Sequence, residues 1–547
     1  MDTNNKILKN SISAVLVFVP IVVLLYIFNK YAINIPHWDD HPLKSFVLKF
    51  DEITSTKDKI LLIFSQHNEH RIGLTRLLTL INFKLSGNLD FKFLMWVGLS
   101  FLFGVLFTFY IAFKKYNLES KYFIPISFTL VGIYPYENLF WAMASIQNIG
   151  VILIAIVCFY LVAVSRNKAS FFTLIILTFW GVFTSGNGVL IPVVCCLILL
   201  LKRQYKHFWV YILVSGILFF LYFNGYQKPD STKLQVAFLT SADFYKSAMA
   251  MVGTSIDLSL VNPIKRIDAS MVVGVFLMIF TVLLIWQIVF KKYNTEKKDF
   301  DVFWAAILIF GFGTIFATTL GRLNYGAETL LTSKYKIYSV LMLCAFYAVA
   351  LNSFNKNGQN RSFIVALITS IGFWYYGYLL DYPSVVTTRQ DRLSELFNGH
   401  SYTDYPYRRV KLFTESVEKL LPNIPAKDEY DFWINDTPNG VLIEGKKSFD
   451  FNVRNAENGV YLLLKSESKS YLYPLYLSKI AKKDLILLIS EQAFKAKYSL
   501  NLPTEYIDNG KYQLIKIKIL GYRTEIEKYS KILDVQSVKK INPKQNW

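Results

Sequence analysis

Residues 11–41 read SISAVLVFVPIVVLLYIFNKYAINIPHWDDH, an apolar segment followed at once by two aspartates with histidines on either side. An apolar run of about twenty residues can cross a bilayer as a helix. No small-residue cleavage site follows it, so we expect this helix to be retained. Adjacent carboxylates at the exit of a membrane helix are costly near lipid unless they bind or react with something. The stretch therefore predicts a membrane protein with a polar site at one face of the bilayer.

The loop after this helix, residues 34–92, contains a second polar cluster, Gln66-His67-Asn68-Glu69-His70-Arg71. Beyond it, apolar residues recur with helical spacing at Leu74, Leu77, Leu78 and Ile81, and polar residues fall on another side at Arg71, Thr75, Thr79 and Asn82. We expect a helix opened by Glu69 that lies in the membrane interface and turns its polar face to water. The loop would then build a polar chamber beside the aspartates.

Composition places the whole chain in the same class. Of its 547 residues, 53% are apolar and 16% aromatic, and the mean hydropathy is +0.33. These values exclude an ordinary soluble protein and predict an α-helical polytopic membrane protein. The net charge of +20 does not indicate nucleic acid, because Lys and Arg recur in short loops between apolar spans. The cysteines lie inside apolar spans without metal-site spacing, so neither disulfides nor a zinc site are expected: Cys158, Cys195, Cys196 and Cys344.

We expect about eleven transmembrane helices from the apolar spans. These cover residues 11–33, 93–113, 122–135, 147–165, 170–185, 188–201, 208–224, 269–290, 302–320, 335–354 and 362–380. With the N-terminus inside, every connection assigned to the cytoplasm is basic, as the positive-inside rule requires. The prediction is a multi-pass protein of a cell membrane, and the family resemblance described below implies a bacterial inner membrane. Residues 1–380 form the membrane domain, and residues 381–547 form an extracytoplasmic domain.

Two spans are too short to cross alone, residues 123–134 and 189–201. The first ends in the polar run 134–138, and the second begins in the helix-breaking run 185–188, which contains Asn187. Short or broken helices are tolerated where they line a cavity. Two further outer segments are expected near them: a weakly amphipathic interfacial or re-entrant helix at 244–258, and the connection 321–335, which carries Arg322 and Lys334.

The C-terminal region changes character. Up to about residue 422 it contains two stretches that suit amphipathic helices. After that, β runs occur at 441–443, 460–465, 471–477 and 512–520, and turn residues such as 438–440 and 508–510 separate them. The sequence predicts a domain that begins helical and becomes β-rich.

Several polar residues suit chemistry, and each has a plainer alternative. Two close carboxylates such as Asp39 and Asp40 repel, which raises one pKa and makes a competent base, or they cap the following turn. The sequence does not distinguish which of the two would be the base. Arg71 presents a guanidinium that matches phosphate oxygens in pairs, or it begins an interfacial helix. Arg322 and Lys334 could bind the same phosphate or anchor helices at the headgroups.

The order of these elements resembles the GT-C class of membrane glycosyltransferases. It consists of a first helix, the loop motif Trp38-Asp39-Asp40, an interfacial helix begun by Asn68-Glu69-His70-Arg71, and many further helices. This class includes the protein O-mannosyltransferases and the aminoarabinose transferase of lipid A. The connection Gly321-Arg322 to Ser333-Lys334-Tyr335 is similar to a Gly-Arg and Ser-Arg-Tyr pattern in bacterial relatives, with Lys334 where Arg is usual. The resemblance covers about the first 380 residues.

This resemblance implies an enzyme that moves a sugar from a polyprenyl-phosphate carrier to a glycan, lipid or protein acceptor of the cell envelope, with inversion. The base role falls on Asp39 or Asp40. The substrate-binding residues would be Trp38, Glu69, His70, Arg71, Asn187, Arg322 and Lys334. The sequence names no cofactor and leaves a divalent cation open.

Two other classes of function remain open. A polysaccharide polymerase or ligase would use the same lipid carriers, although we would expect it to depend on a large outer loop between late helices. A flippase or transporter would place ionisable residues at the middle of its helices. The centres of the apolar spans are almost free of charge, which disfavours transport.

Overall fold

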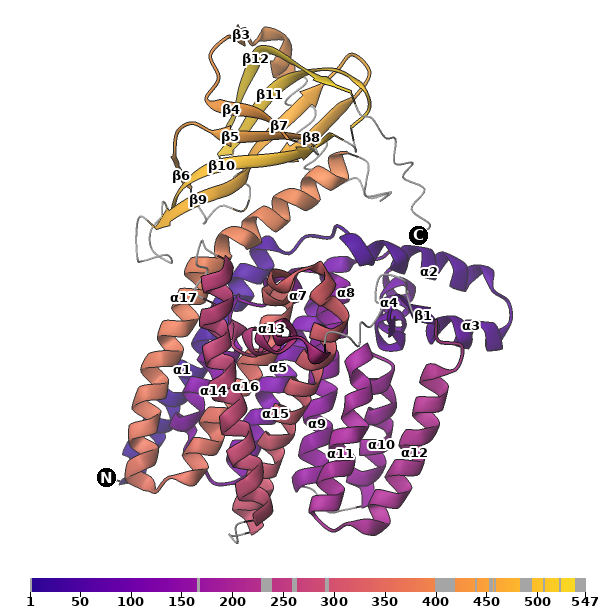
Figure 1. Cartoon of the computed structure of the whole chain (residues 1–547), viewed down its shortest axis with the longest axis vertical. Coiled ribbons are helices and arrows are strands. Elements are labelled where there is room, and N and C mark those ends of the chain that lie inside the picture. The colour runs from indigo at the N-terminus through magenta and orange to yellow at the C-terminus, as the bar shows by residue number, and fades with distance from the viewer. Residues whose placement is uncertain are drawn as a thin grey trace. The chain divides into compact units, whose positions relative to one another are not determined.

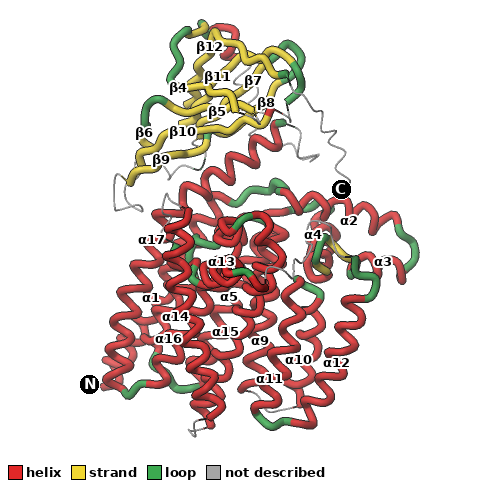
Figure 2. Tube along the Cα trace, viewed as in Figure 1, coloured by secondary structure: helices red, strands yellow, loops and turns green. Residues whose placement is uncertain are grey.

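The computed structural model describes residues 2–536 except 165–167, 228–238, 258–262, 291–294, 399–418, 438–439, 452–455, 457–458, 483–493, 505–506 and 521–522. The chain forms two compact units. The first, Met1–Phe28 with Leu43–Gly377, is a bundle of helices that run side by side (Figure 1). The second, Asn29–Pro42 with Tyr378–Trp547, contains the long strands, drawn yellow in Figure 2.

Eight helices in the described part of the chain are long and apolar enough to cross a membrane, which confirms the multi-pass class. They are α1 (Asp2–Tyr31), α5 (Phe91–Lys115), the stretch Ala142–Val164 that ends in α9 (Gly150–Val164), α12 (Tyr205–Phe223), α14 (Pro263–Phe290), α15 (Thr295–Arg322), α16 (Ser333–Ser353) and α17 (Lys356–Phe397). Two shorter apolar helices, α10 (Lys168–Val182) and α11 (Leu190–Leu201), occupy the spans expected at 170–185 and 188–201. Aromatic packing joins the bundle: the buried Trp304 of α15 lies 4.6 Å from the ring of Phe109 in α5.

The span expected at 122–135 is a broken segment. It consists of a 3-10 turn, η2 (Ser120–Phe123), then α6 (Ile124–Leu130), then irregular backbone. The Tyr122 hydroxyl donates to Asn360 near the start of α17, and the Tyr134 ring lies 5.0 Å from that of Phe373. Asn360 and Phe373 are separated by about 20 Å of helix. The broken segment therefore runs alongside α17. Its side chains are buried in protein, and such burial tolerates irregular backbone at membrane depth.

The first loop folds into α2 (His41–Glu52), α3 (Thr56–Ile63), a small hairpin of β1 (Gln66–His67) and β2 (His70–Arg71), and α4 (Gly73–Ser86). The expected helix exists, but it begins at Gly73, after the hairpin. The sequence had suggested that Glu69 opens this helix, but Glu69 lies in the hairpin that precedes it.

The predicted orientation of α4 is wrong. Its polar residues Thr75, Thr79 and Asn82 are buried, whereas Ile81 and Leu85 are exposed. The polar groups have partners inside the protein: the Thr79 hydroxyl donates to the Thr75 carbonyl, and the Asn82 carbonyl oxygen accepts from the Asp90 N–H at 2.8 Å. In a membrane protein the apolar face of a helix can face outward, because lipid is as apolar as a protein core.

The outer segment expected at 244–258 contains α13 (Ala242–Val252). This helix packs against α14 through two glycines. A Cβ at Gly253 would lie 1.9 Å from the Ser270 carbonyl oxygen, and a Cβ at Gly274 would lie 1.8 Å from that of Met249. Only glycine permits the two backbones to touch in this way.

The described residues of the second unit form two five-stranded sheets. One has the order β4 (Phe432–Thr437), β5 (Gly440–Gly445), β10 (Phe494–Pro503) and β6 (Phe449–Phe451), with β9 (Tyr476–Lys482) also paired to β10. The other has the order β3 (Ala426–Lys427), β12 (Arg523–Val535), β11 (Gly510–Leu520), β7 (Gly459–Lys465) and β8 (Ser470–Pro474). The predicted β runs coincide with β5, β7, β8 to β9, and β11. Of the two expected helices before residue 422, the first is the continuation of α17 to Phe397, and residues 399–418 lie outside the described residues.

One hydrophobic core joins the two sheets. Alternate residues of β5, β7, β10 and β11 point into it, among them Ile443, Leu462, Leu500 and Leu514. The opposite face of β7 is also covered, because Tyr461 and Leu463 pack in a second cluster with Leu421 and with Phe397, the last residue of α17. The β-domain is therefore built onto the end of α17.

A buried cation stabilises the second sheet. Lys516 of β11 is 8% exposed and forms ion pairs with Asp431 and Glu527, and the Tyr529 hydroxyl lies 3.0 Å from the Glu527 carboxylate. Burial alone would raise the pKa of Glu527, but the Lys516 ammonium, with Lys427 and the Tyr529 hydroxyl, lowers this pKa to about 2.

We predict that the second unit loses stability in acid through this pair. Because the folded pKa of Glu527 is below its unfolded value of about 4.3, the contribution is complete above that pH and is lost as the pH falls toward 2. Glu527→Gln should lower the melting temperature at pH 7 and reduce the loss between pH 5 and pH 3. Thermal unfolding of the detergent-solubilised chain measures both. Glu525→Gln, at an exposed carboxylate of the same strand, is the control; an unchanged pH slope in Glu527→Gln would contradict the prediction.

Candidate functional site

A tight hairpin places Glu69 and His70 side by side in the first unit. His67 and His70 pair across it, so Asn68 and Glu69 form the two-residue turn. Asn68 has a φ of +48°, a left-handed conformation that asparagine adopts more readily than most residues. The Asn-Glu turn, rather than a helix start, therefore sets the direction of the Glu69 side chain.

Glu69 forms an ion pair with Arg322, the last residue of α15, and its carboxylate lies 3.5 Å from His70 Nε2. Burial would raise the pKa of Glu69, but its electrostatic interactions with His70 and Arg322 and the hydrogen bond from Arg322 outweigh burial and lower this pKa. The sequence had proposed each of these residues separately. The structure brings all three into contact.

A second contact fixes the imidazole. The Gly186 N–H donates to His70 Nδ1 at 3.1 Å, so Nδ1 is an acceptor and Nε2 carries the proton that faces Glu69. Gly186 opens the turn η4 (Gly186–Val189), and a Cβ there would lie 2.6 Å from His70 Nδ1. The helix break at 185–188 is thus a contact surface for the hairpin. The neighbouring Asn187 donates to the Tyr338 hydroxyl at 2.9 Å.

The other broken span contributes Glu137. It lies in α7 (Tyr136–Phe140), and its carboxylate accepts from the Lys334 N–H at 2.9 Å. Its own N–H donates to the Ser333 hydroxyl. Tyr335 is within electrostatic range of Arg322, Glu69 and Glu137. The breaks at 134–138, 185–188 and 321–335 therefore belong to one polar cluster of the first unit, which we call the Arg322 cluster (Glu69, His70, Glu137, Asn187, Arg322 and Lys334).

Arg71 has different contacts from those expected. Its Nε donates to the Tyr222 carbonyl at 2.6 Å, Nη1 to the Phe64 carbonyl at 2.7 Å and Nη2 to the Asn224 carbonyl at 2.7 Å. Tyr222 and Asn224 lie at the C-terminus of α12, whose last carbonyls have no partner within the helix. Arg71 therefore caps α12, and only two of its five N–H groups remain for a phosphate.

The second unit contains the first-loop aspartates. The exit of α1 forms a turn, η1 (Trp38–Asp40), in which Trp38 has a φ of +44°. Such backbone costs of the order of 1–3 kcal/mol for a bulky residue and persists where surrounding contacts impose it. Here the Asp40 N–H donates to the His37 carbonyl at 2.9 Å, and the His37 N–H donates to the Asp40 carboxylate at 3.0 Å. The Trp38 ring stacks on His37 and is 55% exposed.

The two aspartates have different surroundings. Asp40 is fully buried, caps the turn, and is within electrostatic range of the buried Arg392 of α17. Asp39 is half-buried, and among the described residues its carboxylate has no hydrogen-bond or ion-pair partner. Capping therefore describes Asp40, and Asp39 is the carboxylate available to another molecule.

From the sequence alone, no role was predicted for Glu137, Tyr335 or Arg392. Glu137 had a signal, because it follows the helix break at 134–135 on the side where the first loop was expected. Arg392 had none, since Asp40, the first-loop group that it faces, lies about 350 residues earlier in the sequence.

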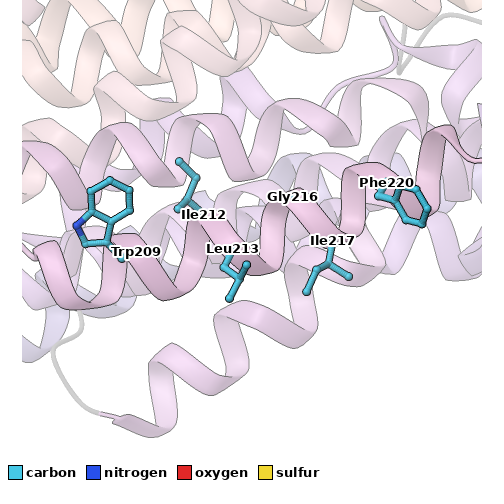
Figure 3. Close-up of a pocket in the computed structure, with 6 residues that line it drawn as sticks. All are labelled: Trp209, Ile212, Leu213, Gly216, Ile217 and Phe220. Carbon is cyan, nitrogen blue, oxygen red and sulfur yellow. The ribbon is translucent and has the colours of Figure 1, made fainter.

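Two further features bear on ligands. Among the described residues, no group of three or more His, Cys, Asp or Glu side chains is arranged to hold a metal ion. A groove follows one side of α12 and is lined by apolar residues alone, as Figure 3 shows: Trp209, Ile212, Leu213, Gly216, Ile217 and Phe220. Without a polar group this groove cannot orient a reacting substrate, and it matches the lipid-facing side of a membrane helix.

No protein-family model, curated protein or solved structure matches this chain. The resemblance to the GT-C class therefore stays a prediction, carried by the motifs and by the residues described above.

Replacement of Arg71 by Lys should destabilise the protein although it keeps the charge. One ammonium cannot reach three carbonyls, and each buried carbonyl left without a partner costs roughly 1–3 kcal/mol. We expect Arg71→Lys to lower the melting temperature. Lys84→Arg, a charge-preserving change at an exposed position of α4, should leave the melting temperature unchanged. An unchanged melting temperature together with weaker lipid-phosphate binding would instead assign Arg71 to a phosphate.

Proposed function

We propose that this chain is an inverting glycosyltransferase of GT-C type. It would transfer a sugar from a polyprenyl-phosphate carrier to a glycan, lipid or protein acceptor on the extracytoplasmic side of a bacterial inner membrane. The observation that carries the proposal is Asp39, a half-buried carboxylate without a partner among the described residues, on a strained turn at the exit of a membrane helix. Strained turns of this kind occur preferentially at functional sites.

The proposed reaction uses Asp39 as general base. Its carboxylate takes the proton of the acceptor hydroxyl while the hydroxyl oxygen attacks the anomeric carbon. The bond between that carbon and the phosphate oxygen breaks, and the polyprenyl phosphate leaves with the electron pair. A positioned base contributes about 10²–10⁴ in rate. Attack from the side opposite the leaving group inverts the configuration at the anomeric carbon.

The Arg322 cluster of the first unit, taken by itself, has cations that suit the phosphate of a lipid carrier. Arg322 is only about two-thirds buried and holds its charge opposite Glu69, which can release part of the guanidinium fork to an anion. Lys334 lies at the start of α16, where its N–H is fixed by Glu137. Fixed cations stabilise the charge that develops on a leaving oxygen without reorganisation during the reaction.

Two alternatives use overlapping features. A polymerase or ligase would also need outer cations for a lipid phosphate, but it would not need Asp39. A transporter would move a substrate without releasing free polyprenyl phosphate. Incubation of the purified protein with a panel of polyprenyl-phosphate sugars and measurement of the free lipid phosphate separates transfer from transport. The dependence of that release on Asp39 separates the glycosyltransferase from a polymerase or ligase.

Asp39→Asn should lower transfer by at least about 10², because the amide keeps the size of the side chain but cannot accept the proton. The rate of lipid-phosphate release is the measurement, and the melting temperature should remain near that of wild type. Asp58→Asn, at an exposed first-loop carboxylate, should retain full activity. Near-normal transfer by a well-folded Asp39→Asn would remove the base from the mechanism.

Arg322 and Lys334 should respond differently to exchange of one cation for the other. Arg322→Lys should weaken donor use, since an ammonium cannot match two phosphate oxygens at once, and Arg322→Ala should weaken it further. Lys334→Arg should be tolerated, whereas Lys334→Ala should raise the KM for the donor. Unchanged donor affinity and turnover in both folded Ala variants would leave these cations as helix anchors only.

A further inference from the structure

We propose that Arg392 is a positioning residue: it holds Asp40 and thereby fixes the turn that presents Asp39. The role of Asp39 as a base rests on the proposed function. The effect of Arg392 on the conformation of the turn does not depend on that function. It makes the last turns of α17 a required part of the first-loop site. All residues in the argument belong to the second unit.

The geometry begins with two buried opposite charges. Asp40 has no exposed surface, and Arg392 is 2% exposed. The guanidinium lies within electrostatic range of Asp40, and also of Glu395 and Asp391 on its own helix. A buried carboxylate is strongly destabilising without a compensating cation. Arg392 therefore compensates charge on Asp40, whose carboxylate accepts from the His37 N–H.

Independent contacts join the same two segments on both sides of this pair. One helical turn further along α17, the Glu395 carboxylate lies 3.4 Å from His37 Nδ1. One turn before it, Arg389 donates to the Lys30 carbonyl at 3.5 Å. Still earlier, the rings of Tyr31 and Tyr382 meet edge to face at 5.6 Å. The exit of α1 is thus aligned along α17, and Arg392 lies at the level of the strained turn.

Arg392 cannot itself act on a substrate, because its side chain is almost fully buried. What it controls is the capping bond between Asp40 and the His37 N–H, which closes the turn against the left-handed backbone of Trp38. Without this cation the turn has less to offset its strain, and Asp39, the residue between Trp38 and Asp40, loses its fixed direction. Displacement of a reacting group by about 1 Å can cost about 10²-fold in rate.

The β-domain supports the arrangement from the other side. The Tyr476 hydroxyl of β9 donates to the Asp391 carboxylate at 2.7 Å, and Arg389 donates to the Ala456 carbonyl at 3.1 Å. These contacts hold the turn of α17 that contains Arg392. The β-domain therefore contributes to the first-loop site through Arg392.

The experiment compares Arg392→Met, Arg392→Lys and, as a matched control, Lys516→Met in the full-length protein. Lys516→Met also removes a buried cation from the second unit, but away from the turn. Hydrogen–deuterium exchange of the peptide that contains residues 34–43 reports directly on the His37 and Asp40 amides. We expect Arg392→Met to raise their exchange rate by about ten-fold or more, Arg392→Lys to give an intermediate rate, and Lys516→Met to leave the rate unchanged.

Kinetics provide the second measurement. Arg392→Met should lower kcat at least about ten-fold while the donor KM changes by less than about three-fold, because the donor phosphate is bound elsewhere. Arg392→Lys should recover part of kcat, and it replaces the Met variant if that protein does not accumulate. Wild-type exchange of the two amides in a folded Arg392 variant overturns the inference, and so does faster exchange with unchanged kcat. Absence of transfer by the wild-type protein, with the exchange result as expected, counts against the proposed function alone.

Discussion

Carbonyl oxygens left free where helices end determine the shape of the first loop. Arg76 of α4 donates to three carbonyls at the C-terminus of α3, and Arg71 binds that region and the C-terminus of α12. Near a bilayer, water competes poorly for such groups, so the protein must satisfy them itself. Both first-loop arginines, Arg71 and Arg76, therefore bind backbone carbonyls before any ligand is considered. Arg322, whose partner is a carboxylate, is the cation of this region best placed to exchange it for a phosphate.

Local sequence patterns predicted where the helices and strands lie, but they predicted less well what surrounds each of them. The eight long helices follow from apolar length alone, and β5, β7 and β11 follow from short runs of β-forming residues. The face of α4 could not be inferred, because periodicity shows that a helix has two faces without showing which of them meets lipid. Protein interior and lipid are both apolar, so the usual rule that apolar residues lie inside does not apply at this boundary.

The sequence indicated the individual residues of the candidate site, but it did not indicate which of them contact one another. Glu69, Arg322, Asp39 and Asp40 stand out locally, by charge beside apolar spans. Their partners do not: Glu69 and Arg322 are 253 residues apart, and the sequence between them carries no sign of the contact. Arg71 shows the reverse error, since its position on a polar helix face suggested a ligand where the structure has a cap. Such assignments depend on which backbone groups are left unsatisfied, and that is known only when the chain is folded.

His37 and Glu395, which are in contact, lie 358 residues apart in the sequence. This part of the site can therefore form only after the end of α17 has been synthesised. At translation rates of about 5–20 residues per second, the end of α17 emerges roughly 20–70 s after the exit of α1. Throughout that interval Asp40 has no Arg392 beside it and remains hydrated, and the turn around Asp39 is not yet closed. A nascent chain therefore acquires its proposed base only near the end of its synthesis. Incomplete chains therefore lack the closed turn because of the order in which their residues are made.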